Sequence, residues 1–421
     1  MVQRVGQEGL TLRRPQPQAE PSLAHITRRT SAGLRSTAPA LSFALWSVGF
    51  RPFYLLASIY AAVSIPLWVC QYVGYLPTAY LRSQVWHGHE MLFGYTLAVI
   101  AGFLFTAVRT WTGQPTPTGA TLAAFALLWI AGRVLIVTPY EVAAAAVNAA
   151  FPVAVAIRIG IPLWRSGNGR NYFFAAVLVL LGLAVLALHL SYLGVLTWPE
   201  WASLQVGLDL VLFILTVMGG RVIPMFTNNG IPGAQATRNP LVEKLALGGI
   251  LVLLGADVLQ APAEAVAVLA LAVAAAHVAR LYLWQPWRTV RTPLVWVLHS
   301  SYGWIVVYLV LRALAGIGVV AESLAVHALT IGAIGGMTIG MMTRTARGHT
   351  GRSITTDGFE VVCFVLIQLA ALIRVMGGMF VPGAYSATII ASGICWSAAF
   401  AIYAVRYWPV LSRARLDGKP G

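Results

Sequence analysis

The chain has 421 residues, of which 58% are hydrophobic and 10% are charged, and its mean hydropathy is +0.77. Soluble domains carry about 25% charged residues, so this composition excludes a soluble globular protein. The formal net charge of +15 would suit a polyanion such as nucleic acid, but the distribution of the charges has a different explanation, given below. The three cysteines, Cys70, Cys363 and Cys395, show no CxxC spacing and predict no disulfide framework.

Residues 1–40 are rich in Arg, Pro, Ser, Thr and Gln and lack an apolar stretch, which predicts a disordered basic extension. The apolar blocks that follow are each near the ~20 residues that cross a bilayer as a helix. They predict an all-α, polytopic integral membrane protein with one membrane domain over 41–412 and a short tail over 413–421. About twelve transmembrane helices are expected, at 53–75, 85–108, 119–138, 141–162, 172–196, 202–225, 241–260, 264–284, 293–316, 321–343, 358–380 and 386–408. The tight join between the third and fourth ranges leaves a re-entrant hairpin as the alternative there.

Lys and Arg are divided unequally between the two sides of these predicted spans. Of the 28 residues, 24 fall on the side that holds both termini, and only Arg82, Arg133, Arg312 and Arg374 fall on the other. Because cytoplasmic flanks retain positive charge, both termini are expected in the cytoplasm. The positive charge then faces anionic lipid of the inner leaflet, so no nucleic-acid partner is needed to explain it.

Four histidines are expected in the outer half of the predicted membrane domain. His87 and His89 open the second span, and His189 and His327 lie about two turns from the outer ends of the fifth and tenth. At a rise of ~1.5 Å per residue these four share one layer. Intramembrane ionisable residues mark functional sites, and imidazoles in one layer could ligate a haem, a copper ion or both. The alternative is that each histidine forms hydrogen bonds across helices and holds the bundle together.

The segment from Trp86 to Met91 is dense in candidate ligands. In a regular helix His87 and His89 point about 200° apart, so they cannot serve one undistorted metal site. His87 and Met91 share a face and suit haem or copper, with packing as the alternative for the methionine. In the tenth span, small residues recur every four positions and predict a smooth ridge for another helix or for a porphyrin face, at Ala328, Gly332, Gly336 and Gly340.

Other ionisable residues within or near the spans are weaker candidates. Arg133, Arg312 and Arg374 suit haem propionates, yet nearby acids could neutralise the same arginines. Glu90 and Asp209 are candidate proton carriers, with ion pairing to arginine as the alternative. A second, looser layer near the inner face contains histidines whose claim as ligands is smaller: His277, His299 and His349.

Several motifs in one order carry a family resemblance. They are Gly49-Phe-Arg-Pro-Phe53, Trp86-His-Gly-His-Glu-Met91 followed by Gly94, Ala101-Gly-Phe103 running to Trp111-Thr-Gly113, Arg221-Val-Ile-Pro-Met-Phe-Thr227, Pro293-Leu-Val-Trp-Val-Leu-His299, His327-Ala-Leu-Thr330, and Met342-Thr-Arg344 running to Gly348-His-Thr-Gly-Arg352. From about residue 41 to the last span, the sequence resembles the NnrS family of bacterial membrane proteins. The resemblance implies an inner-membrane protein that binds haem and copper and takes part in the response to nitric oxide. Its histidines fall on His87, His89, His189, His299, His327 and His349, whereas His277 lies outside the motifs.

The leading functional hypothesis is a haem b and copper protein of the bacterial inner membrane that binds or redox-processes nitric oxide (NO) or a related small ligand. Such a ligand can enter from the lipid, and turnover would add a need for an electron donor. A secondary transporter is the first alternative, since twelve spans broken by Pro and Gly suit alternating access. A metal-sensing or metal-delivery membrane protein is the second alternative.

Overall fold

The computed structural model describes residues 43–77 and 80–419. Within these ranges the ordered elements are helices, and the β-pairing is limited to one isolated antiparallel bridge between Phe43 and Arg413. The predicted all-α class is therefore confirmed. The predicted extension over 1–40 and the last two residues of the predicted tail lie outside the described residues.

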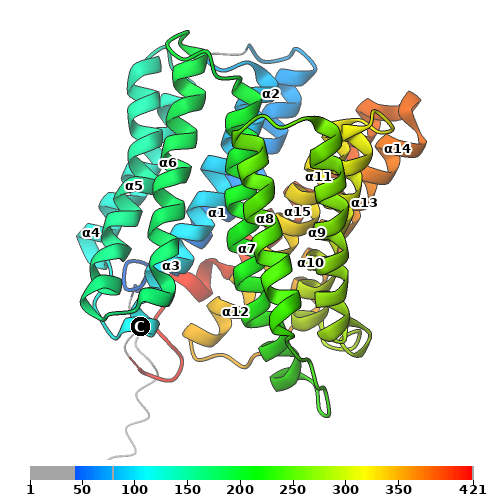
Figure 1. The fold of residues 1–421 in the computed structure, drawn as a ribbon. Coiled ribbons are helices and arrows are strands. Elements are labelled where there is room, and N and C mark those ends of the chain that lie inside the picture. Colours follow the sequence, from blue (N-terminus) through cyan, green and yellow to red (C-terminus); the bar gives the residue numbers. More distant parts are fainter. Residues whose placement is uncertain (1–42, 78–79, 420–421) are drawn as a thin grey trace, which may run out of the picture. The chain divides into compact units, whose positions relative to one another are not determined.

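Each of the twelve predicted ranges falls on a helical segment (Figure 1). The first six are α1 (Phe50–Tyr72), α2 (Ser83–His89) continued by η2 (Glu90–Thr96) and α3 (Leu97–Thr112), α4 (Gly119–Leu135), α5 (Glu141–Arg165), α6 (Tyr172–Tyr192) and α7 (Glu200–Gly230). The second six are α8 (Pro240–Val258), α9 (Ala263–Leu283), α10 (Pro293–Gly316), α11 (Glu322–His327) continued by η5 (Ala328–Gly335) and α12 (Gly336–His349), α13 (Gly358–Leu372) continued by η6 (Ile373–Gly377) and α14 (Gly378–Phe380), and α15 (Tyr385–Ser412). Short 3-10 turns lie at Gly169–Asn171, Pro286–Arg288 and Pro382–Ala384.

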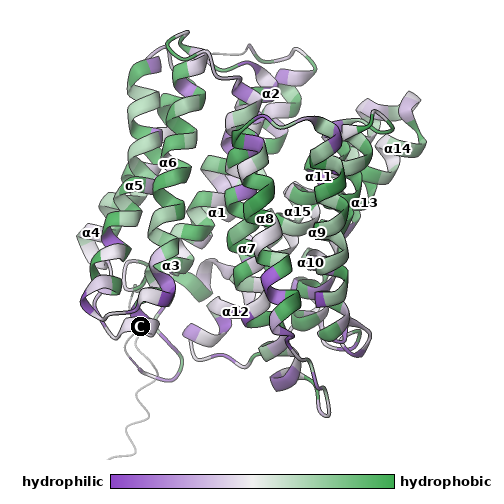
Figure 2. Cartoon of the chain, viewed as in Figure 1, coloured by the Kyte–Doolittle hydropathy of each residue, from purple (hydrophilic) through white to green (hydrophobic). Residues whose placement is uncertain are grey.

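Ten of these twelve segments are long and apolar enough to cross a membrane, by length and composition alone. Figure 2 shows apolar residues along the helices and hydrophilic residues gathered at many of their ends. The other two segments are α4, which has 17 residues, and α8, which carries Glu243, Lys244 and Asp257 within its 19 residues. Helices adjacent in sequence pack against each other, as α5 does on α6, and α1 also packs against α15.

Three of the long helices contain a π-helical segment: η2, η5 and η6. The π-helix is rare and is frequently found at functional sites. His89 directly precedes η2, His327 directly precedes η5, and Arg374 lies inside η6. Each of the three π-helical segments therefore lies at or next to a candidate residue.

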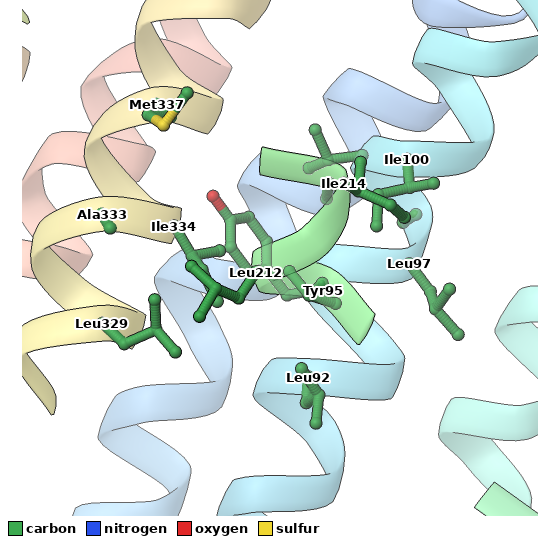
Figure 3. Packing of buried hydrophobic residues seen from close by; sticks show 14 of the residues in the cluster. Leu92, Tyr95, Leu97, Ile100, Leu212, Ile214, Leu329, Ala333, Ile334 and Met337 are labelled. Atoms are coloured by element: carbon green, nitrogen blue, oxygen red, sulfur yellow. The ribbon is translucent and has the colours of Figure 1, made fainter. Parts of the chain in front are cut away.

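Apolar side chains from several helices meet in the core (Figure 3). Tyr95 of η2 lies there with Leu212 of α7 and Met337 of α12, and its hydroxyl lies 2.5 Å from Oγ1 of Thr338.

The predicted ridge of small residues faces another helix, α10. A Cβ added at Gly332 would lie 2.2 Å from the Trp304 ring, and one added at Gly336 would lie 2.0 Å from Oγ of Ser301. A Cβ at Gly340 would lie 2.9 Å from the Val297 side chain. Of the two expectations for this ridge, close helix packing is therefore the one that these contacts support.

Candidate functional site

The four histidines of the predicted outer layer form two separate pairs. The rings of His87 and His327 are nearly parallel, at 12°, with centroids 6.2 Å apart. His89 and His189 instead face each other through Nε2 atoms that are 3.2 Å apart. Because His87 and His89 are two residues apart on α2, they point to different partners, as the helical geometry predicts.

The His87–His327 pair is held by its surroundings and is half-buried. Trp68 of α1 stacks on His87, with centroids 4.3 Å apart. Nδ1 of His327 donates a hydrogen bond to the backbone oxygen of Ser323 at 2.6 Å. This bond fixes the tautomer and leaves Nε2 of His327 with its lone pair, which is the arrangement of a metal-binding histidine.

Arg374 lies near this pair and acts electrostatically on both rings. It is buried, and its Nη2 donates to the hydroxyl of Tyr385 at 2.8 Å. Its Nη1 has no hydrogen-bond partner, and no carboxylate within the described part of the chain forms an ion pair with it. The guanidinium also lies over the Tyr385 ring, 4.8 Å from its centroid, and its remaining Nη1 suits an anionic ligand.

The His89–His189 pair is supported on both sides. Nδ1 of His89 lies 2.7 Å from Oε1 of Glu90, and Nδ1 of His189 lies 3.1 Å from the hydroxyl of Tyr80. Burial, followed by the charge of Glu141, raises the pKa of Tyr80 to about 12, so its hydroxyl is neutral and can accept a hydrogen bond from Nδ1 of His189. Both imidazoles are fully buried, and each has its Nδ1 atom oriented by a neighbour while the Nε2 atoms face one another.

Two of the three candidate arginines are paired with acids. Nη1 of Arg133 donates to both oxygens of Glu90 at 2.9 Å, and Tyr60 also donates to Glu90. Gly94 makes room for this ion pair, because a Cβ there would lie 2.3 Å from Nη1 of Arg133. Arg312 binds two acids, Asp209 and Asp257. The alternative that acids neutralise the arginines therefore describes Arg133 and Arg312 but not Arg374.

The remaining predicted ligands have ordinary structural contacts. The Met91 sulfur accepts a hydrogen bond from Ser64 at 3.5 Å. The ring nitrogens of His299 lie 3.0 and 3.3 Å from backbone oxygens of Val295 and Trp284. The His349 ring packs against Phe50 of α1, with centroids 5.7 Å apart. Across the described residues, no group of three or more His, Cys, Asp or Glu side chains is placed to hold a metal ion.

The sequence interpretation missed the residues that orient these candidates. Trp68 and Tyr80 come from segments that are separated in sequence from the histidines they contact. Ser323 lies four residues before His327, and Tyr385 lies eleven residues after Arg374. Aromatic residues near the ends of the predicted spans were the available signal for Trp68, Tyr80 and Tyr385. A backbone oxygen such as that of Ser323 leaves no signal in the side-chain pattern.

The comparison with known families agrees with the motifs. The family described as NnrS protein matches residues 44–415. This chain belongs to the NnrS family. Membership associates the protein with the response to nitric oxide and with the membrane. Among curated proteins, no match was found. Two NnrS motifs that lie about three hundred positions apart meet in the structure, where Phe50 contacts His349.

Proposed function

We propose that this NnrS protein binds haem b and copper in the bacterial inner membrane and binds or redox-processes nitric oxide. The observation that carries the proposal is a buried arginine, Arg374, that has no acid partner among the described residues and lies beside the parallel pair of His87 and His327. In this combination the two imidazoles would hold the haem, and the arginine would bind a propionate.

His87 and His327 would be the residues that hold the haem, because their nearly parallel rings lie together with centroids 6.2 Å apart. Nδ1 of His327 is already engaged by a backbone oxygen, so ligation through Nε2 costs no existing hydrogen bond of that ring.

The His89–His189 pair suits copper, for which imidazole is a good ligand. With Nδ1 of His89 held by Glu90 and Nδ1 of His189 held by Tyr80, the two Nε2 atoms face each other at 3.2 Å and would be the atoms that hold a copper ion. Glu90, with Arg133 beside it, keeps the charge of this pair balanced and orients His89.

When bound, haem iron and copper supply redox-active centres that accept a diatomic ligand. The chain's contribution is to hold the imidazoles in fixed orientations and to surround them with an apolar core. Small apolar nitric oxide can reach such a site through lipid, and an electron donor would be needed for turnover. We further propose that all twelve helical segments cross the membrane, with both termini in the cytoplasm.

The test is an oxidised-minus-reduced optical spectrum of the detergent-purified protein, with iron and copper quantified. We expect His87→Ala and His327→Ala to lose the haem spectrum, and His89→Ala and His189→Ala to lose copper. His277→Gln is the matched control, because this buried histidine lies outside the NnrS motifs. A folded wild type without colour and without metal would refute the proposal. A wild type with metal but without nitric oxide binding would refute its nitric oxide part and favour metal delivery.

A further inference from the structure

A second cluster of ionisable side chains lies away from the four histidines, where α7, α8 and α10 meet. Nη2 of Arg312 donates to both oxygens of Asp257 at 2.5 Å. Nη1 of Arg312 donates to Oδ1 of Asp209 at 3.3 Å and to the hydroxyl of Tyr308 at 3.1 Å. One guanidinium therefore serves two carboxyl groups.

The two oxygens of Asp209 have different environments. Oδ1 accepts hydrogen bonds from Arg312 and from Nε2 of Gln205, the latter at 3.0 Å. Oδ2 is fully buried and has no donor among the described residues. The Asp257 carboxyl lies beside that of Asp209, because both bind the same Arg312 guanidinium. Two carboxylates can form a hydrogen bond to each other only when one of them carries a proton.

Charge balance leads to the same requirement. The charged and titratable groups that face Asp209 are Asp257 from α8 and Arg312 and Tyr308 from α10, while Gln205 contributes a neutral amide from α7. With both acids ionised, the cluster would hold one uncompensated negative charge in a buried site. An uncompensated buried charge is costly, and adjacent carboxylates share a proton for this reason.

We propose that Asp209 and Asp257 form a proton-binding pair. Oδ2 of Asp209 carries one proton and donates a hydrogen bond to the Asp257 carboxylate, while Arg312 balances the remaining negative charge. A bound metal cation fits the cluster less well, because Ca²⁺ and Mg²⁺ require six or more oxygen ligands. Both Asp257 oxygens and Oδ1 of Asp209 already accept hydrogen bonds from the Arg312 guanidinium, which would also repel a cation.

The two members of the pair differ in exposure. Asp257 lies in the last turn of α8, and its side chain is 13% exposed, whereas that of Asp209 is fully buried. Asp257 is therefore the member at which a proton would exchange, and Asp209 is the member that would hold it. This inference is independent of haem and copper and applies equally to the metal-free chain.

The experiment is infrared difference spectroscopy of the full chain, recorded in H₂O and D₂O at neutral pH. We expect the carbonyl stretch of one protonated carboxyl group, shifted in D₂O and lost in Asp209→Asn. We expect Asp257→Asn to abolish the same band although Asp209 is still present, because the single remaining acid then pairs one to one with Arg312. Glu360→Gln is the control that should retain the band, since Glu360 has its own cation, Arg347.

The result can overturn the proposal in three ways. A wild type without a protonated carboxyl band would mean that both acids are ionised. A band that persists in folded Asp209→Asn and Asp257→Asn would belong to another residue. A band that is replaced by a sodium-dependent change would assign the cluster to a cation. If Asp209→Asn does not fold, Asp257→Asn and Asp209→Glu, which should shift the band without removing it, still decide the matter.

Discussion

The three arginines predicted within the outer ends of the spans have different contacts in this protein. Arg133 and Arg312 bind acids that lie 43 and 55 residues away along the chain. Arg374 has no acid partner within the described residues. The sequence could place all three within spans, but it could not tell them apart, because each pairing depends on the packing of helices that are distant in sequence.

Replacing Arg374 should therefore lower haem binding without lowering the thermal stability of the protein. Arg374→Met removes a buried charge that has no acid, so we expect the metal-free protein to keep or gain thermal stability. Haem retention should fall, and Arg374→Lys should restore it only in part, because lysine lacks the bidentate fork. Thermal unfolding and haem quantification measure the two effects. Full haem content in Arg374→Met would exclude a role in binding a propionate.

Replacing Arg133 should have the opposite effect on stability. Arg133→Met leaves Glu90 buried without its cation, and breaking a buried ion pair in this way costs about 3–5 kcal/mol. The double variant Arg133→Met/Glu90→Gln should recover much of this loss, because no uncompensated charge remains. Unfolding temperatures in detergent provide the comparison. Equal stability of wild type and Arg133→Met would show that the ion pair contributes little.

At the scale of the helix, apolar runs and their Pro, Gly and charged boundaries were sufficient to locate every segment. The second span shows the usual accuracy, since the predicted range 85–108 became a helical segment over 83–112. The π-helical segments were not predictable from the same signals. A run such as Ala328–Gly335 is uniformly apolar or small and has no side-chain period that could reveal an extra residue in the turn.

Close packing of the tenth predicted span on α10 gives a prediction with an internal control. Gly332→Ala should destabilise the protein, because its Cβ would overlap the Trp304 ring. The expected loss is about 1–3 kcal/mol, the usual cost of overpacking. Gly248→Ala in α8 meets nothing within 4 Å and should be neutral or slightly stabilising. If both variants unfold at the same temperature as the wild type, the approach of the two helices is looser than described.

The start of α13 depends on one cap outside the membrane segments. Asp357 accepts from the backbone nitrogens of Phe359 and Glu360, and Glu360 accepts from that of Asp357. Asp357→Ala should lower the free energy of unfolding by about 1 kcal/mol, whereas Asp357→Asn should retain most of the cap.

The same cap makes the stability depend on pH. Burial alone would raise the pKa of Asp357, but hydrogen bonds from Arg406 and from the backbone hold it below its usual value. The contribution of ionised Asp357 to the free energy of unfolding is therefore complete above its unfolded-state pKa. It is lost as the pH falls through the lowered pKa of the folded state. Equal thermal stability of both variants at neutral pH would contradict the role of this cap.

For the whole molecule, the number of helical segments is larger than the number that length and composition mark as membrane spans. Within the described part of the chain, twelve segments are helical, and ten of them meet that criterion. All twelve predicted ranges are helical, but α4 is short and α8 carries three charged residues. Two of these three charges are neutralised within the bundle: Glu243 by Arg280 and Arg238, and Asp257 by Arg312. A window of hydropathy cannot register partners on other helices, so it underestimates how well α8 suits the membrane.

Twelve crossings predict which loops are reached from outside the cell. In a background that lacks Cys70, Cys363 and Cys395, single cysteines would be placed at Tyr140, at Gln260 and in the tail at Gly418. Tyr140 and Gln260 are exposed and follow α4 and α8, the two segments in question. A membrane-impermeant maleimide should label Tyr140→Cys and Gln260→Cys in intact cells, as it should label Thr197→Cys in the loop before α7. Gly418→Cys should react only after lysis, because the excess of positive charge keeps the termini in the cytoplasm. Labelling of the tail in intact cells would reverse the orientation, and protection of either Tyr140→Cys or Gln260→Cys would remove the helix before it from the set of spans.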